Sequence, residues 1–159
     1  MIKATKIIAI DPDVTKSGVA VMDIVSRVIN TYSLSFPNLI DFIYSFPDKE
    51  SIRIAVEAGW LNRKSNFHGY YGNRGERIAK DVGANHETGK KIVEMCEHKG
   101  YFISLVKPLE KRWKGPRGKI THSELESVLK SRKIAFGKKR TNQDERDSIL
   151  IAIYEYDRL

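Results

Sequence analysis

Four acidic residues stand at positions from which they could share one site. Asp11 and Glu57 each end an apolar, strand-like segment, and Asp144 and Asp147 lie in the last helical pattern. A spacing of three residues puts the last two carboxylates on one helix face. If the two apolar segments are neighbouring parallel strands, Asp11 and Glu57 emerge at the same end, about 4.8 Å apart.

Carboxylates gathered in this way repel one another unless cations neutralise them. Oxygen ligands favour Mg²⁺ or Mn²⁺. Two such ions about 3.5 to 4 Å apart can activate a water and stabilise the leaving oxygen in phosphodiester hydrolysis. Each acid alone has an ordinary explanation, because Asp favours turns and acids favour the first turn of a helix. Their joint arrangement after apolar segments is what favours a metal site.

Basic charge is concentrated in one part of the chain. The 159 residues carry a net charge of +8, from 28 Lys and Arg against 20 Asp and Glu. Residues 107–140 hold twelve basic and three acidic side chains, a net of +9, so the remainder sums to −1. A localised excess of this kind predicts a surface that binds a polyanion.

The first half of this basic segment is the better candidate for defined phosphate contacts. Its cations alternate with Gly115, Pro116 and Gly118, where backbone can approach a phosphate closely. The predicted contacts are Lys107, Lys111, Arg112, Lys114, Arg117 and Lys119. Six further cations in 130–140 are expected to supply only general attraction.

Residues 58–75 lack periodicity and alternate glycines with aromatic and basic residues. A loop of this length inside a compact domain is usually functional or disordered. Its candidate nucleic-acid contacts are Trp60, Arg63, Lys64 and Arg74. Trp60 has two evenly weighted interpretations, a ring that stacks on a base or a core residue.

The elements that must position these residues follow from hydrophobic periodicity. Strands are expected at 7–11, 19–23, 27–34, 52–57 and 101–106, and helices at 38–46, 76–99, 123–131 and 142–157. The sequence Ser123 to Glu126 has the spacing of a capping box. This order predicts an α/β fold in one domain, 1–159. Its sheet is mixed and five-stranded, with three antiparallel strands followed by parallel ones, and helices flank it.

Composition excludes several classes of protein. One cysteine, Cys96, cannot form an intramolecular disulfide, so a reducing, cytoplasmic environment is expected. No apolar run reaches the roughly 18 residues of a membrane span, and the first residues resemble no targeting signal. Neither a membrane partner nor a small-molecule cofactor is expected.

The ordered set of motifs resembles a known family. The segments IIAIDPDVTKSGVAVMD, IRIAVEAGW, VG within the long helix, LVKP and TNQDERDSILIAI are similar to those of RuvC-type Holliday junction resolvases, in the RNase H-like superfamily. The resemblance runs from about residue 6 to residue 153. It implies an RNase H-like fold and a homodimer that nicks two strands symmetrically across a four-way DNA junction.

The resemblance also implies roles for individual residues. Two Mg²⁺ ions, with Mn²⁺ as a substitute, would be held by Asp11, Glu57, Asp144 and Asp147, and the nucleophile would be a metal-bound water. Trp60 would stack at the opened branch point. Lys111 and Lys119 would lie near the scissile phosphate.

Three positions modify this picture. Asp13 stands where the family commonly has glycine, and a role in the turn is favoured over metal contact. Asp147 stands where some relatives have histidine, so His122 gains no role from the match. Glu145 is expected to point away from the acidic face into solvent.

Other functions remain open at this point. One is another RNase H-like nuclease, acting on an RNA strand or on a different branched nucleic acid. A second is a junction-binding protein without catalytic activity. A third is an actin-like ATPase, since residues 11–18 loosely resemble its phosphate loop, although the chain is short for that two-domain fold.

Overall fold

The structure is a computed structural model that describes residues 3–62 and 73–159. The strands are β1 (Lys6–Asp11), β2 (Ser17–Asp23), β3 (Val28–Leu34), β4 (Ile52–Glu57), β5 (Phe102–Val106) and β6 (Ala135–Phe136). The helices are α1 (Phe36–Tyr44), α2 (Asn73–His98), α3 (His122–Ser131) and α4 (Gln143–Asp157), with short 3₁₀ turns η1 (Lys49–Ser51), η2 (Gly59–Leu61) and η3 (Pro116–Gly118). Arg63 and Lys64 lie outside the described residues.

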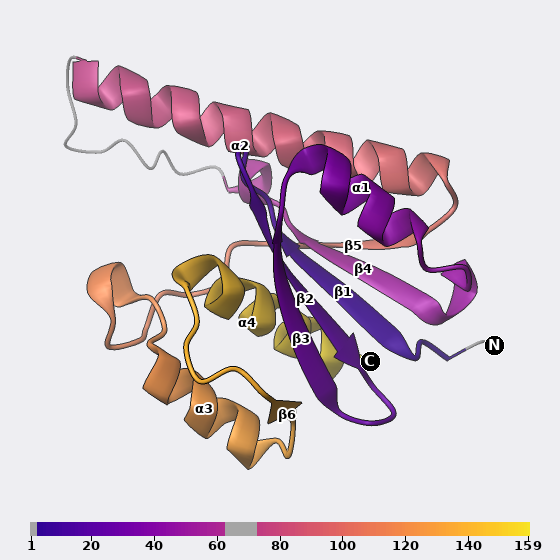
Figure 1. Ribbon diagram of the computed structural model, residues 1–159. Helices are drawn as coiled ribbons and strands as arrows, with labels where there is room; N and C mark the ends of the chain where they lie inside the picture. The colour runs from indigo at the N-terminus through magenta and orange to yellow at the C-terminus, as the bar shows by residue number, and fades with distance from the viewer. Residues whose placement is uncertain (1–2, 63–72) are drawn as a thin grey trace.

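The strands form one mixed sheet in the order β5-β4-β1-β2-β3-β6 (Figure 1). As predicted, β1, β2 and β3 are antiparallel, and β4 and β5 continue parallel to β1. The prediction of five strands was wrong by one, because β6 pairs in parallel with β3. Its two residues are too few to show a strand period in the sequence.

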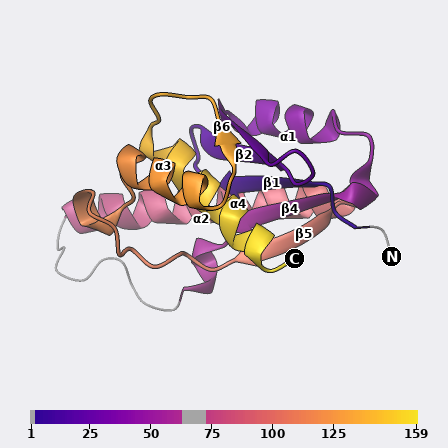
Figure 2. The same cartoon turned by 90° about the horizontal axis from the view of Figure 1, so that it is seen from below.

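Helices cover both faces of the sheet (Figures 1 and 2). On one face α1 and α2 pack over a core that includes Ile8 and Ile10. On the other face α4 and α3 pack over a core that includes Ile7 and Ala9. Because successive side chains of a strand point to opposite faces, β1 is buried on both sides, as its continuous apolar sequence predicts.

The start of α3 differs from the prediction. Thr121 caps the helix, and its hydroxyl accepts from the backbone N–H of Glu124 while the Glu124 carboxylate accepts from the backbone N–H of Thr121. The predicted capping box at Ser123 was therefore wrong by two residues. The cap must have extended backbone, which Thr121 has, whereas Ser123 already lies within the helix.

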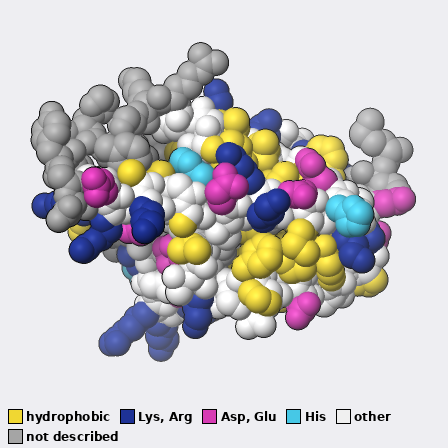
Figure 3. Space-filling view, turned by 90° about the horizontal axis from the view of Figure 1, so that it is seen from above, with side chains coloured by type: hydrophobic (Ala, Val, Ile, Leu, Met, Phe, Trp, Pro, Cys, Tyr) yellow, Lys and Arg dark blue, Asp and Glu magenta, His cyan; other side chains and the backbone are white. Residues whose placement is uncertain are grey.

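The two halves of the long α2 differ in how deeply their apolar side chains are buried. Its C-terminal half buries Ile92 and Cys96 in the core, while Ile78 and Val82 in its N-terminal half are only partly buried. Only the C-terminal half of α2 therefore contributes its apolar side chains fully to the core. Figure 3 shows the outer face of α1 and α2, where charges of both signs are interspersed and hydrophobic side chains gather over α1. No helix among the described residues is long and apolar enough to cross a membrane.

Candidate active-site cleft

Strand register brings Asp11 and Glu57 to the same end and the same face of the sheet. Ile10 of β1 pairs with Val56 of β4, so the next residue on each strand is an acid. Asp11 shares the strand face of Ala9, and Glu57 that of Ala55, both buried beneath α4. Both carboxylates therefore point toward the side on which α4 packs.

The first two turns of α4 supply the other two acids. Asn142 caps the helix, and its side chain accepts from the backbone N–H of Glu145 at 2.8 Å. Gly18, which pairs with Asp11, lets the helix approach, because a Cβ at that position would lie 2.5 Å from the backbone oxygen of Asp144. The start of α4 is thus held against the strand end that carries Asp11.

The acids of this cluster influence one another electrostatically. Burial, followed by the negative charges of Glu57, Asp147 and Asp144, raises the pKa of Asp11 well above its usual range. The pKa of Glu57 is raised by burial and then by Asp147. The pKa of Asp144 is raised by burial, then by Asp13 and Asp147. The structure therefore brings together all four acids that the sequence singled out.

Two protein donors already engage Asp147. Lys119 Nζ lies 3.3 Å from one carboxylate oxygen, and Gln143 Nε2 donates to the other at 2.8 Å. Lys119 also lowers the pKa of Asp11 and of Glu57, and Lys111 lowers that of Glu57. Among the residues that the structure describes, no three His, Cys, Asp or Glu side chains form a ready-made metal-binding group. Cations of the protein thus offset part of the acidic charge.

The donor set nevertheless suits a divalent cation. All four acids offer oxygen ligands, the kind that Mg²⁺ prefers. Burial and the neighbouring acids raise the pKa values of Asp11, Glu57 and Asp144, and a bound cation would favour their ionised forms. Asp147 keeps a lone pair free on each oxygen beside its bonds to Gln143 and Lys119, so it too can serve as a ligand.

A cleft of about 530 Å³ opens beside these acids. One wall carries Asp11, Glu57 and Asp147. The rest of the lining comes from η2, from α2 and from the loop between β5 and α3, which contributes Lys111 and Lys119. The cleft therefore brings basic side chains beside acidic ones.

Trp60 forms part of the η2 wall. The side chain is half-buried and lines the cleft. Its ring lies over Gly89 of α2, where a Cβ would come within 2.6 Å of it, and stands edge-on to His86 with ring centroids 6.4 Å apart. The ring thus packs against α2 and also lines the cleft, and its stacking on a base stays a prediction.

The other predicted DNA contacts among the described residues lie outside the lining of the cleft. The loop before α3 carries four of them, all with exposed side chains: Lys107, Arg112, Lys114 and Arg117. Arg74 is exposed in the first turn of α2. None of these five lines the cleft. Of the basic residues that the sequence proposed, the structure brings Lys111 and Lys119 to the acids.

Two expectations about neighbouring acids have different outcomes. Asp13 occupies the turn, where its Oδ1 accepts from the backbone N–H groups of Thr15 and Lys16. The expectation that Glu145 is solvated was wrong, because its side chain is only 12% exposed. It accepts from Thr31 Oγ1 at 2.5 Å and from Lys138 Nζ at 2.7 Å. Sequence spacing could not reveal these partners, because Thr31 is distant along the chain and Lys138 lies on an irregular segment.

Several cleft and network residues were missed by sequence reasoning. Asn85 and His86 line the cleft from α2, and Asn85 Oδ1 accepts from the backbone N–H of Val14 at 2.8 Å. The glycine at position 89 was an available signal, because glycine inside a helix often marks a close approach. Gly83, the glycine of the VG match, has open space around it instead.

Comparisons with known proteins identify the fold. No family model matches the chain, and no curated protein matches its sequence. The structure of Thermus thermophilus RuvC in complex with a Holliday junction substrate aligns with a TM-score of 0.57 and 14% identity, over 97% of this chain and 95% of that one. A second T. thermophilus RuvC structure gives 0.53 and 13%, over 96% and 95%. The chain therefore shares the RNase H-like fold of RuvC over nearly its whole length.

Proposed function

We propose that this protein is a metal-dependent endonuclease that resolves four-way DNA junctions. The observation that carries the proposal is the convergence of Asp11, Glu57, Asp144 and Asp147 beside a cleft that Lys111 and Lys119 also line. The similar T. thermophilus structure is a complex with a Holliday junction substrate, which supports a branched DNA as the substrate.

The four acids would hold two Mg²⁺ ions, and Mn²⁺ would substitute. When bound, such ions activate a water for attack on phosphorus and stabilise charge on the leaving oxygen. Lys119 and Lys111 would attract the scissile phosphate into the cleft and orient it. Trp60, whose free face lines the cleft, would stack on a base at the branch point, an interaction worth about 1 to 3 kcal/mol.

Each strand is cut by hydrolysis of one phosphodiester. A water oxygen forms a new bond to phosphorus, the bond from phosphorus to the leaving oxygen breaks, and a proton passes to that oxygen. Paired nicks leave ends that can be ligated, so two sites must act on one junction. We therefore propose a homodimer, which sedimentation with and without junction DNA would test.

The decisive experiment is cleavage of a mobile four-way junction by the wild type and by Asp144→Asn. We expect paired symmetric nicks that require Mg²⁺, and a variant that binds the junction normally but does not cut it. Unchanged nicking by Asp144→Asn would contradict the assignment of the acids. Binding without cutting by the wild type at any Mg²⁺ or Mn²⁺ concentration would instead indicate a junction-binding protein without catalytic activity.

The same assay separates the second candidate, an RNase H-like nuclease for another substrate. A panel of four-way junction, flap and RNA–DNA hybrid substrates distinguishes the two, because the Trp60 wall favours an opened branch point over a continuous duplex. Preferential cutting of the hybrid or the flap would replace the junction as the substrate.

A further inference from the structure

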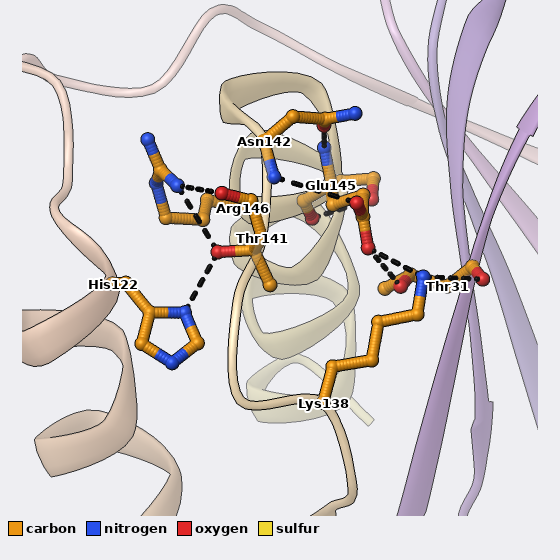
Figure 4. Close-up of polar contacts among 8 residues, drawn as sticks. Thr31, His122, Lys138, Thr141, Asn142, Glu145 and Arg146 are labelled. Atoms are coloured by element: carbon orange, nitrogen blue, oxygen red, sulfur yellow. Dashed lines mark hydrogen bonds and ion pairs between the residues drawn. The ribbon is translucent and has the colours of Figure 1, made fainter.

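The two residues between Asp144 and Asp147 hold the start of α4 from opposite sides (Figure 4). On one side Glu145 bonds to Thr31 of β3 and to Lys138. On the other side Arg146 reaches the segment that precedes α3 and the residue that precedes the cap of α4. Its Nε donates to the backbone oxygen of Ile120 at 2.9 Å, and its Nη1 donates to that of Thr141 at 2.6 Å.

The contacts of Arg146 continue to an acid and to a lysine that line the cleft. Arg146 Nη2 donates to Gln143 Oε1 at 3.1 Å, and Gln143 Nε2 donates to Asp147 Oδ1 at 2.8 Å. The same Gln143 amide lies 3.4 Å from the backbone oxygen of Ile120. Ile120 directly follows Lys119, whose ammonium pairs with the other oxygen of Asp147 at 3.3 Å.

These bonds form a closed circuit through Arg146, Gln143, Asp147, Lys119 and Ile120. Ile120 is itself buried, so its carbonyl is a fixed point of the body. A planar guanidinium with donors in a rigid fork can serve three acceptors at once, which an ammonium cannot do in the same geometry. The circuit therefore couples the basic loop to the acidic helix at the residues that face the cleft.

A second contact extends this coupling to α3. Thr141 Oγ1 lies 3.0 Å from Arg146 Nη1 and 2.8 Å from His122 Nδ1, as Figure 4 shows. Arg146 donates to this hydroxyl, so the hydroxyl proton is available to the ring nitrogen of His122. The N-termini of α3 and α4 are thus joined through one threonine.

We propose that Arg146 and Gln143 are positioning residues that hold Lys119 and Asp147 in their paired arrangement at the cleft. Neither would touch the DNA or a reacting atom. Gln143 orients the Asp147 carboxylate through one oxygen, and Arg146 fixes both Gln143 and the backbone from which Lys119 projects. The catalytic meaning of this role rests on the proposed nuclease function, but the mechanical coupling does not.

The test compares Arg146→Ala, Arg146→Lys and Gln143→Ala with the wild type, and uses Arg158→Ala as a matched control. Arg158 is an exposed arginine at the other end of α4, and it is not part of the circuit. Three quantities are measured: hydrogen exchange of residues 113–121 without metal or DNA, binding of Mn²⁺ by calorimetry, and the Mg²⁺ dependence of single-turnover junction nicking.

For Arg146→Ala we expect faster exchange in 113–121 and unchanged exchange in β1 and β4. Loss of a residue that orients metal ligands typically costs 10- to 100-fold in metal affinity or activity, so the Mn²⁺ affinity and the Mg²⁺ half-saturation should weaken by roughly that factor. Arg146→Lys should resemble Arg146→Ala, since its charge is kept but its fork is lost. Gln143→Ala should weaken Mn²⁺ binding with less change in exchange, because Arg146 still holds Ile120.

Rescue by Arg146→Lys, or exchange and Mn²⁺ affinity that match Arg158→Ala, would overturn the proposal. If Arg146→Ala does not fold, Gln143→Ala and Arg146→Lys decide. If the wild type folds and binds Mn²⁺ but cuts no junction, the proposed function fails, and the exchange and Mn²⁺ measurements still decide whether these two residues position the site.

Discussion

The acidic and basic sides of the cleft rest on different kinds of support. Asp11 and Glu57 extend from buried parallel strands, so the register of the sheet fixes where their backbones lie. Lys111 and Lys119 stand on a loop whose backbone bonds are mostly internal, such as those from Trp113 to Gly118 and from Gly115 to Lys119. An acidic side fixed by strand register suits a site where metal ligands must be preorganised, whereas the basic side depends on the few bonds that tie its loop to α4, such as that from Arg146 to Ile120.

The difference also has an energetic consequence. Desolvated acids that lie close together destabilise the folded chain when all of them are ionised, as the raised pKa values of Asp11, Glu57 and Asp144 indicate. Cations on an exposed loop carry no comparable cost, because water solvates them. Removal of an acidic charge should therefore stabilise the metal-free chain, whereas removal of a loop cation brings no comparable gain.

The largest effect is expected for Asp11→Asn. Loss of one ligand of the proposed metal site should remove about 4 kcal/mol of transition-state stabilisation, which is roughly a thousandfold in the rate of junction nicking. The same change should raise the melting temperature of the metal-free protein at pH 7, since it removes the most crowded charge. About 1 kcal/mol corresponds to about 2 to 4 °C for a chain of this size.

The pH dependence gives the sign of this stability effect. The pKa of Asp11 is higher in the folded chain than in the unfolded chain, so its contribution to stability is fully present below pH 3.8 and is lost as pH rises through the folded value. The advantage of Asp11→Asn over the wild type should therefore shrink toward pH 4. Thermal melts in chelator between pH 4 and 8 measure it, and a variant less stable than the wild type at pH 7 would contradict the crowding of the acids.

Smaller effects, of opposite sign on Mn²⁺ binding and on junction nicking, are expected for Lys119→Met. Loss of the ammonium beside Asp147 should strengthen Mn²⁺ binding to the DNA-free protein, because about 1 kcal/mol of charge repulsion disappears, roughly fivefold in affinity. Junction nicking should fall at the same time, since the phosphate loses its partner. Calorimetry and single-turnover assays measure the two quantities.

Lys107→Met is the control for this pair of measurements. Its side chain is exposed outside the cleft, so its Mn²⁺ affinity should equal that of the wild type. Weaker Mn²⁺ binding by Lys119→Met would show that Lys119 supports the acids instead of competing with a cation.

The same contrast explains which features were predictable from the sequence. The positions of Asp11 and Glu57 at strand ends were predictable, because continuous apolar segments identify central strands. The alternation of side chains along a strand then determines on which face of the sheet each carboxylate lies. The Asp144 and Asp147 pair followed from helical spacing. Each of these inferences uses only local periodicity and one topological rule.

What the sequence did not reveal depends on contacts between distant segments. The bond from Arg146 to Ile120 spans 26 residues, and that from Glu145 to Thr31 spans 114. Neither has a periodic signature, so Glu145 was wrongly expected in solvent and Arg146 was not considered. β6 was missed for a related reason, since only its pairing with β3 makes those two residues a strand.

The smallest effect is expected for Lys114→Ala, on the exposed part of the basic loop. Its backbone N–H bonds to the Glu124 carboxylate, so the substitution removes the ammonium but keeps the loop attached to α3. If Lys114 contacts one phosphate, the slope of log affinity against log salt should fall by about 1 for junction binding. Nicking at saturating junction and the Mn²⁺ affinity should stay at wild-type values, because the side chain lies outside the cleft. Filter binding between 50 and 200 mM salt, conditions over which such slopes are resolved, measures the change. A loss of nicking at saturating DNA would mean that the exposed part of the loop takes part in the reaction, and the division between a distant attracting surface and the two cleft lysines would then have to be abandoned.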